Sequence, residues 1–205
     1  MKFNKYTTNI IMSINAIIKG FQQRLHNKKL KDNMTLELLE RCIDNYNNTI
    51  MMEKQINTHL SKKKIRQSNF PSHISENIAK FAICKRYGIM PTWDTEKGDL
   101  FINSQLEVKG SIDLHNGPPT FGPTEVWSHI FFVDGVDTQL KKYKVYHFPL
   151  SNDSDKWRNL KVNKTETYHD QCIQKRRPRL SFKQIQSQLP NECTLIFDGH
   201  ISQLV

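Results

Sequence analysis

The sequence predicts an α+β protein in which helices flank a mixed β-sheet, with a helical part at the N-terminal end. Apolar residues recur at steps of three and four between Leu36 and Tyr46, which is typical of a helix. Ile130–Val133 is a short continuous apolar run and indicates a strand buried on both faces. Between them, residues 99–110 alternate apolar and charged side chains as a β-hairpin does. Helices around a mixed sheet are the simplest architecture for this order.

Residues 7–65 are predicted to be mostly helical, with Asn33 or Thr35 as a cap. Met1–Gly20 is apolar but interrupted by Asn and Ser, and it has no small-residue cleavage pattern. We therefore expect a helix there and no signal peptide. The basic run Lys62–Arg66 links this part to the rest, as either a solvated helix end or a phosphate contact.

A second helix is predicted from Pro71 and Ser72 to Tyr87, with Gly88 as its stop signal. Glu76 lies among apolar residues of this helix. Two interpretations stay open for it: a first-turn carboxylate favoured by the helix dipole, or an acidic group directed at a functional site.

The remaining chain is expected to alternate loops with short elements. Residues 111–123 are rich in Gly and Pro and predict a loop. Lys144–Pro149 and Thr194–Phe197 are predicted strands, and Ser181–Leu189 is a predicted short helix. Residues 151–170 are polar and predicted to be irregular.

The net charge of +10 is unevenly distributed along the 205 residues. Residues 1–70 carry 13 basic and 5 acidic side chains, whereas residues 71–150 carry 8 basic and 9 acidic ones. This pattern suits a protein whose flanks hold a polyanion while its centre holds a metal ion, although charge also serves solubility. No apolar run reaches the length of a membrane span. The 4 scattered cysteines favour a reducing, cytoplasmic location.

The predicted hairpin carries Asp99, Glu107 and Lys109. A three-residue loop at 103–105 pairs Ile102 with Leu106 and Asp99 with Lys109. All aliphatic side chains then share one face, and the charged groups share the other. A two-residue loop would mix the faces. The plain alternative is an amphipathic surface hairpin.

The chemistry of these groups favours a metal site. Mg²⁺ prefers oxygen ligands, and one or two carboxylates beside a substrate phosphate suffice. Asp99 and Glu107 would be those ligands, and the carbonyl oxygen of Val108 is a further candidate. Lys109 could orient or deprotonate a water, or stabilise charge on the phosphate. Gly98 and Gly110 flank the group, and glycine at such positions often marks close approach of a ligand or another backbone.

These residues match the Asp…(Asp/Glu)-x-Lys motif, so the chain resembles the PD-(D/E)xK nuclease superfamily. The stretch from Glu107 to the apolar run 130–132 resembles type II restriction endonucleases most. Gly98 stands where a proline is usual in the motif. The resemblance implies a restriction-endonuclease-like nuclease core over residues 69–205, after a helical region over 1–68.

The resemblance also implies an activity. It implies a Mg²⁺-dependent homodimer that cuts double-stranded DNA at specific sites and leaves 5′-phosphates, with Glu76 joining the catalytic trio. Two other functions stay open: a structure-specific repair or recombination nuclease, and a non-catalytic basic protein that binds nucleic acid.

The candidates for DNA contacts fall in two segments. The loop 111–125 leaves the catalytic strand directly and should lie near the scissile phosphate, while the cluster 174–179 is basic and arginine pairs well with guanine or phosphate. Solvated loop residues are an equal explanation for both. The candidates are Ser111, His115, Asn116, Thr120, Glu125, Lys175, Arg176, Arg177 and Arg179.

Overall fold

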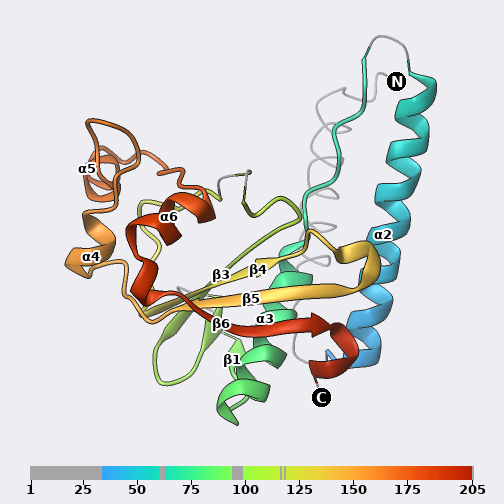
Figure 1. The fold of residues 1–205 in the computed structure, drawn as a ribbon, viewed down its shortest axis with the longest axis horizontal. Coiled ribbons are helices and arrows are strands. Elements are labelled where there is room, and N and C mark those ends of the chain that lie inside the picture. The colour runs from blue at the N-terminus through green and yellow to red at the C-terminus, as the bar shows by residue number, and fades with distance from the viewer. Residues whose placement is uncertain (1–33, 61–62, 94–98, 116, 118, 205) are drawn as a thin grey trace, which may run out of the picture. The chain divides into compact units, whose positions relative to one another are not determined.

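The computed structural model describes residues 34–60, 63–93, 99–115, 117 and 119–204. The predictions for Met1–Gly20, Asn33, Lys62, Gly98 and Asn116 lie outside these residues. Within them, strands in the order β1-β2-β3-β4-β5-β6 form a mixed sheet flanked by helices (Figure 1), which confirms the α+β prediction.

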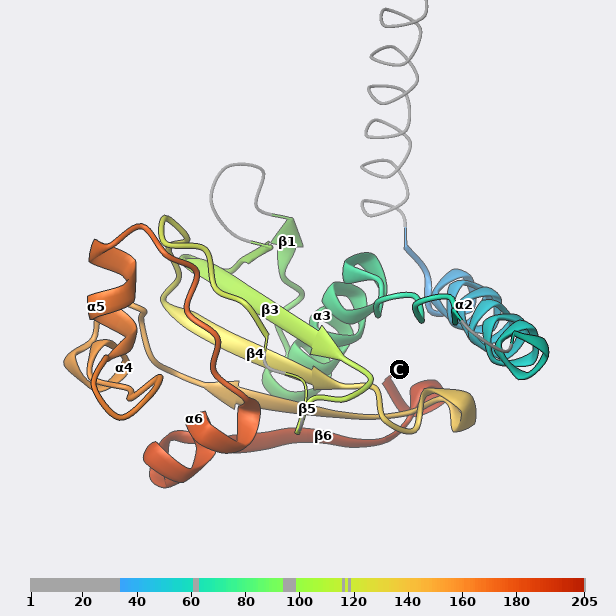
Figure 2. The same cartoon turned by 90° about the horizontal axis from the view of Figure 1, so that it is seen from above.

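The pairing of β3 with β4 is parallel, and the other neighbouring strands pair antiparallel. Figure 2 shows β3 to β6 running side by side. The strands are β1 Thr92–Trp93, β2 Leu100–Phe101, β3 Gln105–Ser111, β4 His129–Asp134, β5 Lys142–Phe148 and β6 Thr194–His200.

The predicted helix after Pro71 is confirmed as α3, Ser72–Tyr87. Gly88 closes it in the left-handed conformation at φ 71°, and its N–H donates to the carbonyl of Cys84. Three further α-helices follow β5: α4 Asp155–Arg158, α5 Tyr168–Ile173 and α6 Phe182–Gln188.

Residues 151–170 are less irregular than predicted, because two side chains cap short helices there. Ser154 accepts a hydrogen bond from the N–H of Trp157, and Thr167 forms a reciprocal capping box with Asp170. Such caps satisfy the free backbone donors at a helix start. They allow short helices to form in a stretch whose polar composition alone predicts irregular structure.

The central strand β4 is buried on both faces, as predicted. Ile130 and Phe132 enter an aromatic cluster with Trp157, Phe182 and their neighbours from α4 to α6. Phe131, on the opposite face, lines an apolar pocket beneath α3. Among the described helices, none has the length and apolarity that a membrane crossing requires.

The long helix α2, Leu36–His59, starts at Thr35, one of the two predicted caps, whose side chain accepts from the N–H of Leu38. Its first four turns bury Leu39, Ile43 and Ile50. Residues 35–205 cluster as one compact unit, so α2 belongs with the sheet. The boundary at residue 68 for a separate nuclease core stays a prediction.

Candidate active site

The β2–β3 hairpin keeps the predicted faces but not the predicted register. Leu100 pairs with Leu106, so the predicted pairing of Ile102 with Leu106 is wrong by two residues. The turn occupies residues 102–104, where Asn103 adopts the left-handed conformation at φ 55°. A shift of two residues preserves the alternation of side chains, so the charged trio still shares one face.

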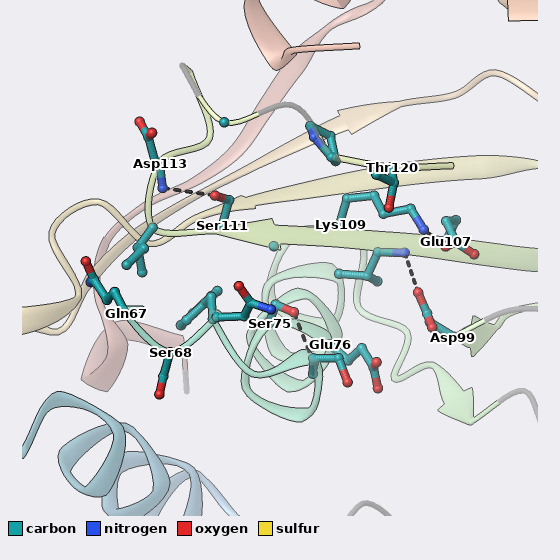
Figure 3. A pocket seen from close by; sticks show the side chains of 18 of the residues that line it. Gln67, Ser68, Ser75, Glu76, Asp99, Glu107, Lys109, Ser111, Asp113 and Thr120 are labelled. Atoms are coloured by element: carbon teal, nitrogen blue, oxygen red, sulfur yellow. Dashed lines mark hydrogen bonds and ion pairs between the residues drawn. The ribbon is translucent and has the colours of Figure 1, made fainter. Parts of the chain in front are cut away.

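The register brings Asp99 beside Glu107 rather than opposite Lys109. The Asp99 N–H donates to the carbonyl of Leu106 at 3.1 Å, and its Oδ2 accepts from the Val108 N–H at 2.8 Å. Lys109 Nζ donates to Glu107 Oε1 at 2.5 Å. Asp99, directly before β2, is therefore held beside the Glu107 carboxylate and the Lys109 ammonium of β3 (Figure 3).

Lys109 has a second carboxylate partner that sequence reasoning missed. Its Nζ lies 3.2 Å from Glu125 Oε2. The Asn152 side chain fixes that segment, because Nδ2 donates to the Glu125 carbonyl at 2.8 Å and Oδ1 accepts from the Trp127 N–H at 3.1 Å. Nothing in the local pattern signals the contact, since 16 residues separate Glu125 from Lys109.

The trio lies in a cleft with a volume of about 770 Å³. Residues 66–70 and Ser72 line one side, with Asp99, Glu107 and Lys109 beside them. The other side is lined by residues 111–113, Gly117, Pro119, Thr120 and Glu125. Glu76 lines the same cleft and is 3% exposed.

The helix-dipole interpretation of Glu76 is wrong. The first turn of α3 contains no acidic residue, since the helix begins at Ser72 and Glu76 falls in the second turn. Its place in the cleft agrees with the other interpretation, an acidic group directed at the site (Figure 3).

Gly110 is explained by the approach of α3 rather than by a ligand. A Cβ at this position would lie 2.3 Å from the Cβ of Ser75 and 3.1 Å from a ring carbon of Phe70. Only a residue without a side chain lets α3 pack so close to β3. This contact places Glu76 at the cleft.

The electrostatics of the trio favour a bound cation. Burial raises the pKa of Glu107 above its usual range, and the charge of Asp99 adds to this, while Lys109 opposes it. Burial disfavours the charge on Lys109, but Glu107, Glu125 and Asp99 outweigh burial and raise its pKa. A single ammonium thus faces several carboxylates.

The donor set fits Mg²⁺. Asp99 and Glu107 present hard oxygen ligands, and added positive charge would relieve their mutual repulsion. Among the described residues, no group of three or more His, Cys, Asp or Glu side chains has a metal-binding arrangement. Two carboxylates are enough for an ion that keeps several waters.

Comparison with known proteins identifies the family. The family model described as Bsp6I restriction endonuclease matches residues 37–187. The chain belongs to the Bsp6I restriction endonuclease family. It is 26% identical over 130 residues to the type II restriction enzyme Bsp6I of Bacillus sp. (strain RFL6), which covers 62% of this chain and 71% of the relative. No solved structure gives a significant match.

The match to the Bsp6I family spans both segments that were predicted to contact DNA, and the structure joins them. Thr120 forms an antiparallel bridge with Arg179, and the Phe121 N–H donates to the carbonyl of Pro178 at 3.1 Å. The basic cluster is therefore anchored to the loop that borders the cleft. Its cations differ in availability, because Arg176 forms an ion pair with Glu166 at 2.6 Å.

The other predicted DNA contacts of this Bsp6I family member fall in two places: Ser111 and His115 at and after the end of β3, and Lys175 and Arg177 after α5. Ser111 lines the cleft, and its hydroxyl accepts from the Asp113 N–H at 2.9 Å. His115 Nε2 lies 3.3 Å from the Asp134 carboxylate. Lys175 adopts φ 56°, and Arg177 is exposed. Their contacts with DNA stay predictions.

Proposed function

We propose that this restriction endonuclease is a Mg²⁺-dependent, site-specific enzyme that hydrolyses phosphodiester bonds of double-stranded DNA with a PD-(D/E)xK catalytic group. The observation that supports this most is the convergence of Asp99, directly before β2, with Glu107 and Lys109 of β3 within one cleft. Membership of the Bsp6I family supports the nuclease class independently.

Asp99 and Glu107 would hold the metal ion, with the Val108 carbonyl as a further oxygen. When bound, Mg²⁺ supplies positive charge for the scissile phosphate and favours ionisation of a water. The Val108 N–H fixes the orientation of Asp99, since it donates to Oδ2 at 2.8 Å. Glu76 adds negative charge at the same cleft.

Lys109 acts as the cationic group of the site. The surrounding carboxylates raise its pKa, so its ammonium form is favoured at neutral pH. Glu107 and Glu125 hold Nζ from two directions, at 2.5 and 3.2 Å. From there Nζ can donate a hydrogen bond to a phosphate oxygen, whose charge grows during attack, or orient the attacking water.

The duplex would lie across the cleft, with contacts from the loop that carries Ser111, His115, Asn116 and Thr120 and from the basic cluster 174–179. Two copies of the chain would cut the two strands, as the resemblance implies.

Digestion of plasmid and of an unmethylated viral genome in Mg²⁺ or EDTA tests the proposal. We expect discrete fragments in Mg²⁺, no cleavage in EDTA, and no cleavage by Asp99→Ala or Lys109→Ala, both of which still bind DNA. The exposed positions of Asp153→Ala and Lys183→Ala make these the matched controls. Cutting by the site variants at the wild-type rate would refute the assignment. A smear, or a requirement for branched DNA, would favour a structure-specific nuclease.

A further inference from the structure

The second half of α2 has little apolar packing to stabilise it. Met51, Met52 and Ile56 are 50%, 61% and 45% exposed, whereas the first half of the helix buries its aliphatic residues. Isolated helical turns are marginal in water. The contacts of this half are instead with the segment that returns toward α3 (Figure 1).

Two polar side chains of α2 hold that segment. The Asn57 Nδ2 donates to the Ile65 carbonyl at 3.0 Å, and its Oδ1 accepts from the Ile65 N–H at 2.8 Å. Glu53 accepts from both the N–H and the hydroxyl of Ser68. These bonds lower the pKa of Glu53, so its charged form is the one that binds the segment.

The C-terminal end of the segment, at Ser68 and Phe70, packs against α2 and the sheet. The Tyr46 hydroxyl donates to the Ser68 carbonyl at 3.3 Å. Phe70 is buried between the rings of Tyr46 and Tyr143, with centroids 5.6 and 6.3 Å away. The connection from α2 to α3 is thus held at several points along one path.

This path borders the proposed active site. Residues 66–69 line the same cleft as Asp99 and Glu107, and Figure 3 shows Gln67 and Ser68 at its border. Lys63, Lys64 and Arg66 are exposed. Within the described residues, no carboxylate forms an ion pair with any of these three cations.

We propose that residues 63–69, here called the arm and held in place by the second half of α2, bind the phosphate backbone of duplex DNA beside the active site. The identity of the ligand rests on the proposed function. The carboxylates of the cleft repel a polyanion, so cations at its border are needed to hold the duplex there. Contacts from Lys63, Lys64 and Arg66 to phosphates would position the duplex without reading its sequence.

The test compares the full chain with the variant Lys63→Ala/Lys64→Ala/Arg66→Ala. Binding to a fluorescent duplex of mixed sequence is measured in EDTA over a range of salt concentrations. Each lost phosphate contact should reduce the slope of log affinity against log salt by about 1. We expect a slope reduced by about 2 to 3 and an affinity at least tenfold lower.

Lys54→Ala is the matched control, because Lys54 is exposed on the adjoining helix α2 and lies outside the arm. It removes one positive charge. If net charge alone set the affinity, Lys54→Ala would lose about one third of the binding free energy that the triple variant loses. We expect its salt slope to equal that of the wild type. A triple variant with wild-type affinity and slope would overturn the proposal.

A second variant tests the positioning of the arm without changing its charge. Asn57→Ala removes both hydrogen bonds to Ile65, and Asn48→Ala is the same substitution at an exposed position of α2. We expect severalfold weaker DNA binding for Asn57→Ala alone, with an unchanged melting temperature of the core. Equal affinities of the two variants would contradict the positioning role.

The experiments distinguish a failure of the arm proposal from a failure of the proposed endonuclease function. DNA binding that depends on the arm, in a protein that cleaves no DNA, would support the arm and overturn the proposed function. Site-specific cleavage with no effect of the arm variants would do the reverse. If the wild-type chain binds no duplex at any salt concentration, both are overturned.

Discussion

Lys109 and Glu125 form an ion pair across the cleft, with Nζ 3.2 Å from Oε2, although they lie on different segments of the chain. Glu107 holds the same ammonium from the neighbouring position on β3. The ammonium is therefore oriented by two carboxylates. If Glu107 also bound a metal ion, Glu125 would keep Lys109 in place.

This arrangement predicts that Glu125→Gln lowers kcat and leaves DNA affinity nearly unchanged. A hydrogen bond to a charged group contributes about 1.5–3 kcal/mol, which corresponds to a loss of roughly tenfold or more in rate. Single-turnover cleavage and metal-free binding, measured together, check the prediction. Glu192→Gln is the control, because Glu192 also pairs with a lysine, on the surface. If Glu125 contacts bases instead, the variant will lose affinity or sequence preference.

The close packing of Gly110 against Ser75 predicts an effect on the stability of the fold. In Gly110→Ala the new methyl group would meet the Ser75 side chain, and overpacking of this kind costs about 1–3 kcal/mol of unfolding free energy. Urea unfolding measures the loss. Ser75→Gly removes the obstructing atoms, so the double variant should lose less than the sum of the two single variants. Simple additivity would show that the close contact is not the cause.

The sequence was sufficient to predict elements that follow from local rules. The Pro71 to Gly88 helix and the buried strand 130–133 are present as expected, because caps and apolar runs act within a few residues. The hairpin register was missed by two residues, since both registers give the same alternation of side chains, which does not fix where the turn begins. The contact of Glu125 with Lys109 depends on the tertiary path of a loop, which periodicity cannot reveal.

The acidic pair predicts that Mg²⁺ stabilises the folded protein. A ligand that binds only the native state raises the unfolding free energy by about 2.7 kcal/mol at a concentration of 100 Kd. We expect Mg²⁺ to raise the melting temperature of the wild type, and EDTA to reverse this. Asp99→Asn should abolish the rise while keeping the hydrogen bond from the Val108 N–H to a side-chain oxygen. An equal rise in both proteins would place the ion elsewhere.

The final prediction concerns acid stability and comes from His147 beneath α3. His147 Nδ1 lies 2.8 Å from the Tyr87 hydroxyl, and Nε2 lies 2.9 Å from Nδ1 of His129. Burial, with a smaller effect of His129, lowers the pKa of His147 to about 4. The unfolded chain, with an ordinary pKa near 6.5, therefore takes up a proton that the folded chain resists.

Stability should consequently fall as the pH drops from about 6.5 toward 4, by at most about 3 kcal/mol from this group. Urea unfolding of the wild type and of His147→Gln across this range measures the effect. The variant loses packing and is less stable at pH 7, but its stability should depend less on pH. Parallel pH profiles for the two proteins would assign the acid sensitivity to other groups, because the shift of His147 contributes only while the imidazole is present.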